Sequence, residues 1–534
     1  MKNGELVSAA EEERFNRIKQ SPRIPPVKSA DYCLNAAGVT ADEVDYIAFG
    51  FDGPAKYLRK TAFAHIKAGE YRHLLQSFPG SIEYAIQLYK LRSELIESHP
   101  ALASKPWVFV PHHLCHAASS YRVSGFNEAI ILTVDGNGEN DSGITAVGRG
   151  PNIEVIARRS IAQSLGGYYG NVTQALGFRR HVDEGKVMGL APYGTDRFDF
   201  SGLKISGHDY KFSRGYNYKR FWEETTVRRK QGQPITSDHQ DFAASAQARL
   251  EDAGVALAQG AHSRTGLRKV CLSGGVALNC DMNAKIMELD FVDQLYTQPA
   301  SHDAGTAIGA AFELSARMGD KSDFVMSHAY WGPEYSSNEI GSFLKESGVM
   351  FSQSQDIAKD TAKILHEGKI VGWFQGRLEI GPRALGNRSI LANPSIPGMK
   401  DRINLKVKHR EDWRPFAPSM LAESANQLVF KSEPSPFMLL TFTVRPEWRN
   451  ALQEATHVDH TVRSQTVTKT ANPLYHHLIT EFESLSGIPA LLNTSFNDAG
   501  EPIVMSPRDA IRTFFCTGLD YLAIGDYLVS KRPH

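Results

Sequence analysis

A run of basic residues punctuated by glycines follows a short apolar stretch in the second half of the chain. Residues 377–414 contain nine Lys or Arg and four Asp or Glu, although the whole chain balances 59 basic against 59 acidic residues. Gly381 and Gly386 flank Arg383, so backbone N–H groups can approach an anion while the guanidinium binds its oxygens in pairs. Polyphosphate binding is the expected chemistry, and a solvated basic face is the alternative.

Two histidines four residues apart are the second candidate for chemistry. A helix would place His112 and His116 on one face, where both imidazoles can share a metal. Alone, this spacing favours histidines that only form hydrogen bonds. Asp135 changes that balance, because it ends an apolar strand before a glycine-rich turn, where a metal and phosphate oxygens can be held together. A plain hairpin turn would have a similar sequence.

Two further segments join a strand or turn to a helix through small residues. Gly274 and Gly275 follow the apolar strand 270–272, and the N-terminus of the next helix would attract the anionic groups of a nucleotide. Asp303 precedes a helix expected over 304–317. As a helix N-cap alone, Asp303 would need no function.

These residues require a scaffold of alternating strands and helices. Strands are expected at 46–51, 107–110, 129–134, 143–147 and 270–272, and helices near 27–37, 80–97, 240–262 and 304–317. Such alternation is typical of an α/β domain, placed here at 1–340. A second α/β domain is expected at 355–534, closing with a helix at 510–516 and a strand at 521–524. A chain of 534 residues is long enough for two domains.

The composition excludes several classes of protein. Hydrophobic residues make up 42% of the chain, and no apolar run has the length needed to cross a bilayer. The five scattered cysteines lack a C-x-x-C pair, which favours a reducing, cytoplasmic setting without disulfides or structural zinc. The zero formal charge argues against nucleic-acid binding. We therefore expect neither a membrane nor a nucleic-acid partner.

Two other segments carry expectations of their own. Asn3-Gly4 is a hairpin-turn signal with only two residues before it, so 5–10 is expected to be an edge strand whose partner strand is missing. The stretch 195–239 is expected to be an insertion. Its aromatic residues form either a stacking platform for an acceptor or an ordinary packed loop. These residues are Tyr210, Phe212, Tyr216, Tyr218, Phe221 and Trp222.

In this order, the glycine-rich and His/Asp segments of the first half resemble the actin-like ATPase superfamily. With the motifs at 11–19, 183–194, 381–388, 413–418 and 493–497, nearly the whole chain resembles the O-carbamoyltransferases of nodulation-factor and antibiotic biosynthesis. Tobramycin-, novobiocin- and cephamycin-type enzymes belong to this group. The resemblance implies an actin-like N-terminal domain, similar to the threonylcarbamoyl transferases, followed by a YrdC-like α/β C-terminal domain.

The resemblance also implies a two-step reaction. A C-terminal site, lying wholly within 355–534, would make carbamoyl-adenylate from carbamoyl phosphate and ATP. An N-terminal site would then transfer the carbamoyl group to a hydroxyl of a small-molecule acceptor such as a sugar or natural product. The enzyme would be a monomer or homodimer.

The residues implied for these steps fall into three groups. Arg383, Lys408 and Arg414 would be the catalytic phosphate contacts. Substrate binding would involve Arg463, Asn493, Ser495, Asn497, Gly274, Gly275, Asn279 and Lys186. The metal ligands would be His112, His116, Asp135 and Asp303. Fe(II) is the expected metal, Mn or Zn are the alternatives, and Mg²⁺ is a further candidate beside ATP.

Two alternatives stay open. An enzyme forming threonylcarbamoyladenosine on tRNA would share both folds, and its only support here is the basic stretch 214–230. The second alternative is a truncated chain that performs only the adenylation half-reaction. Relatives open with a strand and a His-Asp pair ahead of the 11–19 motif, and this sequence has no such pair there.

Overall fold

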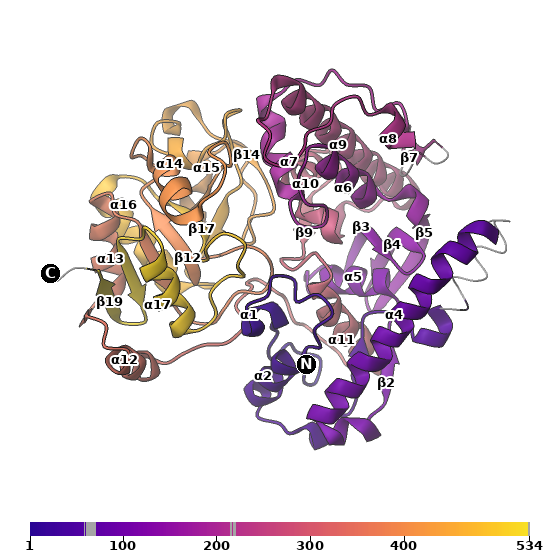
Figure 1. Cartoon of the computed structure of the whole chain (residues 1–534), viewed down its shortest axis with the longest axis horizontal. Helices are drawn as coiled ribbons and strands as arrows, with labels where there is room; N and C mark the ends of the chain where they lie inside the picture. The colour runs from indigo at the N-terminus through magenta and orange to yellow at the C-terminus, as the bar shows by residue number, and fades with distance from the viewer. Residues whose placement is uncertain (58, 60–70, 214–215, 217–219, 532–534) are drawn as a thin grey trace.

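A computed structural model of the chain describes residues 1–57, 59, 71–213, 216 and 220–531. Within these residues the chain forms two lobes that lie side by side (Figure 1). The first lobe is coloured indigo to magenta and the second orange to yellow. The long helix α4 (Tyr71–Ser98) runs along the outside of the first lobe.

The first lobe is built on a sheet of strand order β5-β4-β3-β8-β9. Its strands are β3 (Glu128–Gly138), β4 (Asp141–Arg149), β5 (Asn152–Ser160), β8 (Lys269–Ser273) and β9 (Gln294–Thr297). The first three pair as an antiparallel meander, and β8 and β9 continue the sheet in parallel with β3. This is the sheet of an actin-like domain, so the predicted fold class of the first lobe is confirmed.

Helices and short strands surround this sheet. The helices are α2 (Val27–Ala37), α5 (His112–Tyr121), α6 (Leu165–Ala175), α7 (Glu184–Leu190), α8 (Phe221–Glu224), α9 (Ser237–Thr265), α10 (Cys280–Met287) and α11 (Ala304–Met318). The short strands are β1 (Ile47–Phe49), β2 (Trp107–Phe109), β6 (Leu203–Ser206) and β7 (Asp209–Phe212). Capping sets helix ends as expected: α9 begins after a Thr236 capping box and ends at the left-handed Gly266.

The second lobe is a mixed sheet of order β10-β19-β18-β11-β12-β17-β13-β16. The strands are β10 (Phe351–Gln353), β11 (Val371–Phe374), β12 (Arg388–Ala392), β13 (Ala417–Leu421), β16 (Gln465–Val467), β17 (Ala490–Ser495), β18 (Tyr521–Ile524) and β19 (Tyr527–Ser530). Its helices include α12 (Ser337–Glu346), α13 (Ile357–His366), α14 (Met399–Ile403), α15 (Ala425–Leu428), α16 (Pro473–Ser486) and α17 (Pro507–Cys516). The predicted second α/β unit is therefore confirmed.

The helix α12 belongs to the core of this second lobe. Its Ile340 and Leu344 are buried together with Phe374 and Ile524. A capping box at Ser336 starts the helix. The domain limits of 1–340 and 355–534 stay a prediction, and this packing favours a division just before α12.

The first residues form the predicted turn without the predicted strand. Asn3 and Gly4 have φ of 51° and 83°, and a β-bridge joins Lys2 to Glu5 around them. Residues 6–10 are not a strand, so the expected unpaired edge was wrong. Instead, Leu6 is buried in a cluster with residues of both lobes, and the N–H of Ala9 donates to the Trp331 carbonyl at 3.2 Å.

The aromatic stretch 195–239 packs into the first lobe. The side chains of Tyr210, Tyr216 and Phe221 are no more than 3% exposed within the main core, and the β6–β7 hairpin lies against α9. Phe212 and Trp222 are partly buried against the same core, and Tyr218 lies outside the described residues. The packed-loop interpretation is therefore the right one for the described residues, and the stacking platform was wrong.

Candidate active site and metal centre

Four side chains predicted as metal ligands converge near the C-terminal end of β3, the central strand of the first sheet. His112 and His116 come from one face of α5, Asp135 from β3 and Asp303 from the start of α11. One donor atom from each side chain lies within 4.8 Å of the other three. The two Nε2 atoms are 3.0 Å apart, and Asp135 Oδ2 is 3.3 Å from His112 Nε2 and 3.4 Å from His116 Nε2.

These spacings fit a divalent metal ion. Ligand bonds of about 2.1 Å around a tetrahedral or octahedral ion separate neighbouring donor atoms by roughly 3.0–3.4 Å. The two imidazole nitrogens are 3.0–3.7 Å from each other and from the two carboxylates, and all four donor atoms lie within 4.8 Å of one another. Two imidazole nitrogens and two carboxylates suit Fe(II), Mn or Zn. Asp303 is 76% exposed at the side chain, so the group is open to solvent on that side.

Neighbouring groups fix the orientation of these side chains. His116 Nδ1 lies 3.3 Å from Ser273 Oγ, and the Gly275 N–H donates to Asp135 Oδ1 at 3.0 Å. Gly274 has φ of 92°, and a Cβ there would lie 2.3 Å from the Val134 carbonyl oxygen. The Gly274–Gly275 turn therefore supports the metal-ligand group directly, a role that the sequence did not indicate.

The pKa shifts of the metal-free side chains are consistent with a group of interacting histidines and carboxylates. Burial lowers the pKa of His116, but hydrogen bonds and charge attraction from Asp135 and Asp303 outweigh it and raise the value to about 9. Burial raises the pKa of Asp135, and its histidine partners hold it well below the usual range instead. The buried His113 differs, since burial followed by repulsion from its histidine neighbours lowers its pKa to about 3.

A group of four cationic side chains, named the cationic pocket, forms the second candidate site, where the sequence predicted phosphate contacts: Arg383, Lys408, Arg414 and Arg463. Lys408 is 5% exposed, and its Nζ donates to Asn497 Oδ1 at 2.8 Å and to Ser495 Oγ at 3.2 Å. Burial, then repulsion from Arg410 and Arg414, lowers the pKa of Lys408 well below its usual value. Ser495 and Asn497 therefore serve the pocket by holding this lysine.

The arginines of this cationic pocket are only partly balanced by opposite charge: Arg414 lies 3.8 Å from Glu411. Burial, then repulsion from Arg463, lowers the pKa of Arg383 to about 9. The Nε atoms of Arg383 and Arg463 are buried and have no hydrogen-bond partner among the described residues. Burial also comes first among the causes that lower the pKa of Arg414. Buried donors without partners are costly, and an anion would satisfy them.

The first lobe also bears on the cationic pocket. Lys186, on α7, pairs with Glu411 at 2.9 Å, and the Tyr193 hydroxyl donates to the Trp413 carbonyl at 3.2 Å. The first lobe therefore contacts the segment that carries Arg414. Sequence reasoning placed this site wholly within 355–534.

Other predicted substrate contacts already have protein partners. Asn279 caps α10 through the Met282 N–H and exchanges two hydrogen bonds with Gln247. Lys186 is paired with Glu411, and Asn493 donates to the Ala384 carbonyl at 3.1 Å, next to Arg383. These residues stay predictions as substrate contacts, and the contacts observed are supporting ones.

The sequence profile of the carbamoyltransferase N-terminus matches residues 1–312, and that of the carbamoyltransferase C-terminus matches residues 362–531. The chain therefore belongs to the carbamoyltransferase family and is a carbamoyl-transferring enzyme.

Individual relatives agree with this assignment. The chain is 39% identical to the nodulation protein NolNO of Sinorhizobium fredii, over 100% of this chain and 78% of that protein. It is 35% identical to the 3'-hydroxymethylcephem-O-carbamoyltransferase of Streptomyces clavuligerus, over 48% of this chain and 47% of that protein. Among solved structures, HypF from T. kodakarensis is similar over 42% of this chain and 39% of that one, with a TM-score of 0.30 and 18% identity. That likeness is too distant to carry an argument.

The described helices also bear on the membrane question. None of those in the described part of the chain combines the length and the apolar character that a bilayer crossing requires.

Proposed function

We propose that this carbamoyltransferase is ATP-dependent and transfers its carbamoyl group to a hydroxyl of a small-molecule acceptor. The observation that carries the proposal is the cationic pocket, in which the buried Nε atoms of Arg383 and Arg463 have no hydrogen-bond partner in the described part of the chain. Such a pocket is complementary to a substrate pair as anionic as carbamoyl phosphate and ATP. Relatives with carbamoyl transfer to a hydroxyl in their names support the acceptor class.

The first step takes place in the cationic pocket. Water cleaves the P–O bond of carbamoyl phosphate and releases inorganic phosphate and carbamate. A carbamate oxygen then attacks the α-phosphorus of ATP, the bond to the β-phosphate bridging oxygen breaks, and pyrophosphate leaves with carbamoyl-adenylate as product. Negative charge grows on the phosphoryl oxygens in this step. Arg383, Lys408, Arg414 and Arg463 are preorganised to stabilise it.

The second step takes place beside the His/Asp group. The acceptor hydroxyl attacks the carbamoyl carbon, and AMP leaves. His112, His116, Asp135 and Asp303 would hold the metal. A bound divalent ion would supply positive charge to the phosphate of the leaving AMP. Fe(II) is the metal we propose, with Mn or Zn as alternatives, and Mg²⁺ would accompany ATP.

Partner and location follow from the same properties. We propose a monomer or homodimer in the cytoplasm, with no membrane or nucleic-acid partner. Of the described basic residues in the stretch 214–230, which was the only support for a tRNA substrate, Arg229 is partly buried, and Arg220, Arg228 and Lys230 are exposed. Arg229 Nε donates to the Leu176 carbonyl at 2.7 Å, and its guanidinium lies over Phe178. Arg228 lies over the ring of Trp222.

The test is a substrate-dependence experiment. Pyrophosphate and phosphate release are measured with ATP alone, with carbamoyl phosphate alone and with both, and labelled carbamoyl phosphate is then offered with a panel of hydroxylated acceptors. We expect pyrophosphate release only with both substrates, and label in an acceptor ester. Pyrophosphate release without carbamoyl phosphate, or label retained on tRNA, would contradict the proposal.

A further inference from the structure

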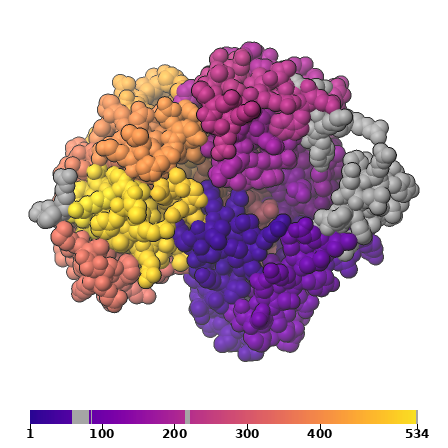
Figure 2. Space-filling view, in the orientation of Figure 1, coloured from indigo at the N-terminus to yellow at the C-terminus, as the bar shows by residue number. Residues whose placement is uncertain are grey.

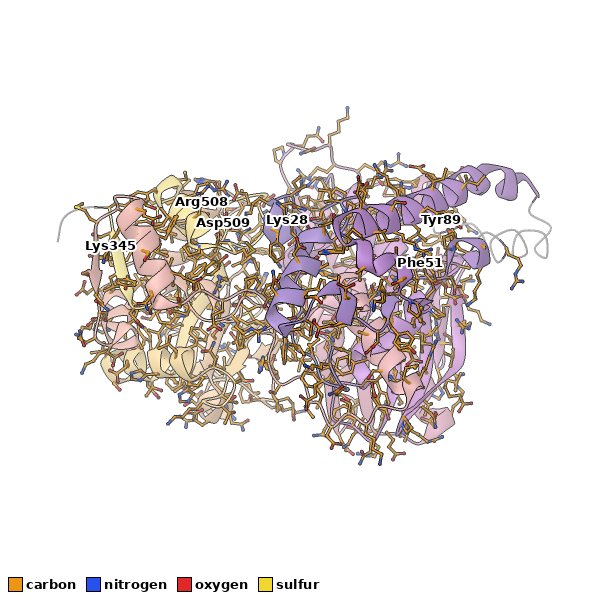
Figure 3. All side chains as sticks on the ribbon, turned by 90° about the horizontal axis from the view of Figure 1, so that it is seen from below. Lys28, Phe51, Tyr89, Lys345, Arg508 and Asp509 are labelled. Atoms are coloured by element: carbon orange, nitrogen blue, oxygen red, sulfur yellow. The ribbon has the colours of Figure 1, made fainter. Side chains whose placement is uncertain are left out.

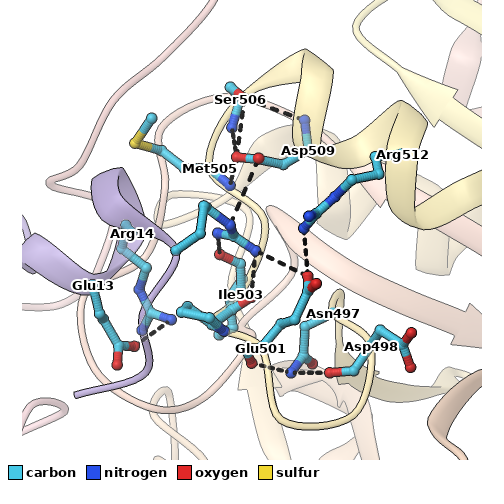
Figure 4. Close-up of polar contacts among 12 residues, drawn as sticks. Glu13, Arg14, Asn497, Asp498, Glu501, Ile503, Met505, Ser506, Asp509 and Arg512 are labelled. Carbon is cyan, nitrogen blue, oxygen red and sulfur yellow. Dashed lines mark hydrogen bonds and ion pairs between the residues drawn. The ribbon is translucent and has the colours of Figure 1, made fainter. Parts of the chain in front are cut away.

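The short helix α1 (Glu12–Asn16) lies between the two lobes. Two arginines, one within the helix and one just after it, donate hydrogen bonds to the second lobe. Arg14 is 2% exposed, and its Nη2 donates to the Gly381 carbonyl at 2.8 Å. Arg17, at the C-terminal end of α1, donates from Nη1 to the Ile503 carbonyl at 2.6 Å and from Nη2 to the Pro502 carbonyl at 2.7 Å. In Figure 2 the indigo N-terminal residues lie against the yellow part of the second lobe, and Figure 4 draws Arg14 together with Asn497, Glu501 and Ile503 of the second lobe.

The loop whose Gly381 carbonyl accepts from Arg14 also carries Arg383. Gly381 has φ of 92°, and a Cβ there would lie 2.5 Å from the Pro299 carbonyl oxygen, so the loop is pressed against the first lobe. The buried Glu379 orders the rest of the loop. Its Oε1 accepts the N–H groups of Leu385, Asn387 and Arg388 at 2.8–3.1 Å. Arg383 therefore stands on a loop that is held at both ends.

The loop whose carbonyls accept from Arg17 also carries Asn497, which accepts a hydrogen bond from Lys408. Asn497 Nδ2 donates to the Glu501 carbonyl at 2.7 Å, immediately before Pro502. The guanidinium of Arg17 also faces the carboxylates of Glu501 and Asp509, at 3.7 Å and 3.6 Å. Asp509 lies at the start of α17, on the second lobe (Figure 3). A single loop, 497–503, therefore carries both the carbonyls that accept from Arg17 and the asparagine that accepts from Lys408.

The same N-terminal segment reaches the His/Asp group. Glu11 accepts from Arg14 at 2.6 Å through Oε2, while its Oε1 lies 3.6 Å from His302 Nε2. His302 precedes Asp303, a candidate metal ligand. One contact chain, from His302 through Glu11 and Arg14 to Gly381, therefore connects the loops of both sites.

We propose that Arg14 and Arg17 are positioning residues for the cationic pocket, which is complete only while α1 is docked on the second lobe. The pocket cations repel one another, so without a bound anion the loops that carry them tend to separate. Charge-assisted bonds from Arg14 and Arg17 to three backbone carbonyls oppose that separation. The proposal rests on the proposed function for the identity of the anion, and its geometry is independent of it.

The experiment uses the full chain and inorganic pyrophosphate as probe. Binding is measured calorimetrically for wild type, Arg17→Met, Arg17→Lys and Arg23→Met. Arg23 is the matched control, because it lies in the same segment and pairs with Glu83 at the exposed surface. We expect the dissociation constant to rise at least tenfold in Arg17→Met, to recover partly in Arg17→Lys, and to be unchanged in Arg23→Met. Thermal unfolding midpoints identify any variant that is unfolded. If Arg17→Met is unfolded, the dissociation constant of Arg17→Lys decides the test.

Kinetics separate positioning from a general loss of fold. In the pyrophosphate-release assay we expect Arg17→Met to raise KM for carbamoyl phosphate far more than it lowers kcat. Wild-type affinity for pyrophosphate in a folded Arg17→Met, or equal losses in Arg17→Met and Arg23→Met, would overturn the proposal. If wild type binds pyrophosphate but never forms carbamoyl-adenylate, the proposed function is wrong and this inference still stands.

Discussion

Lys408 and Asn497 are joined by a hydrogen bond of 2.8 Å between the ammonium nitrogen and Oδ1, with a second bond of 3.1 Å to the Asn497 carbonyl. The lysine is buried among arginines, so neutral oxygens are its only close partners among the described residues. Burial favours the deprotonated form of this lysine, and a bound anion would favour the charged form instead. This arrangement explains why Asn497 and Ser495 occur together in the 493–497 motif.

The first prediction concerns the cations of the pocket. Lys408→Ala and Arg383→Ala should each abolish pyrophosphate release, since loss of one preorganised charge costs several kcal/mol of transition-state stabilisation. Both variants should melt no lower than wild type, because each removes a buried, repelled charge. Stopped pyrophosphate release with an unchanged melting temperature is the expected pair of results. Wild-type rates in either variant would remove the pocket from the mechanism.

The second prediction concerns the metal. Anaerobically purified protein should contain about one equivalent per chain, and His116→Ala should lose most of it, because a missing ligand in a four-donor site weakens binding strongly. Elemental analysis makes the measurement, with the exposed His366→Ala as matched control. Equal metal content in all three proteins would mean that the His/Asp group forms hydrogen bonds only.

The third prediction concerns the ion pair between Lys186 and Glu411, which spans the two lobes at 2.9 Å. In Lys186→Met, Glu411 is released toward Arg414, now 3.8 Å away, and neutralises part of the pocket charge. An interaction of about 1 kcal/mol corresponds to about a fivefold rise in KM for ATP, with kcat little changed. Lys285→Met, which breaks an exposed pair with Glu288, is the control. Adding Glu411→Gln should restore KM, and failure to do so would contradict this explanation.

The sequence predicted the elements better than the contacts between them. Strand and helix periodicity is local, so α2, β8 and α11 were found close to their observed limits. The metal-ligand group was also predictable, because each ligand sits at the end or on one face of such an element. The position of α1 was not, since Arg14 and Arg17 bind carbonyls more than 360 residues away, and backbone acceptors carry no residue-type signal.

Asn279 illustrates the same limit from the other side. A glycine pair followed by Asn at a helix start predicts a nucleotide contact and predicts an N-cap equally well. Only the position of Gln247, on a helix distant in sequence, shows that both ends of the Asn279 amide have protein partners. Local patterns therefore identified candidate residues, and tertiary packing decided which of them have donor atoms left for a ligand.

The last prediction concerns Glu251, a partly buried carboxyl on α9 that faces Asp281 on α10. Burial first, and then the charge of Asp281, raises the pKa of Glu251 to about 7, although a hydrogen bond from Gln247 opposes the shift. The folded pKa lies above the unfolded value, so between about pH 4.5 and 7 the folded state binds more protons. The contribution of this carboxyl to stability is therefore complete below pH 4.5 and is lost as the pH rises through 7.

Glu251→Gln removes that titration while keeping an oxygen to accept from Gln247. We expect its free energy of unfolding to exceed that of wild type by about 2 kcal/mol at pH 8, with the difference shrinking steadily toward pH 5. Urea unfolding at a series of pH values makes the measurement, with the exposed Glu97→Gln as control. A difference that does not change with pH would show that the carboxyl titrates alike in both states. The electrostatic strain would then reside in Asp281, whose pKa burial raises to about 6.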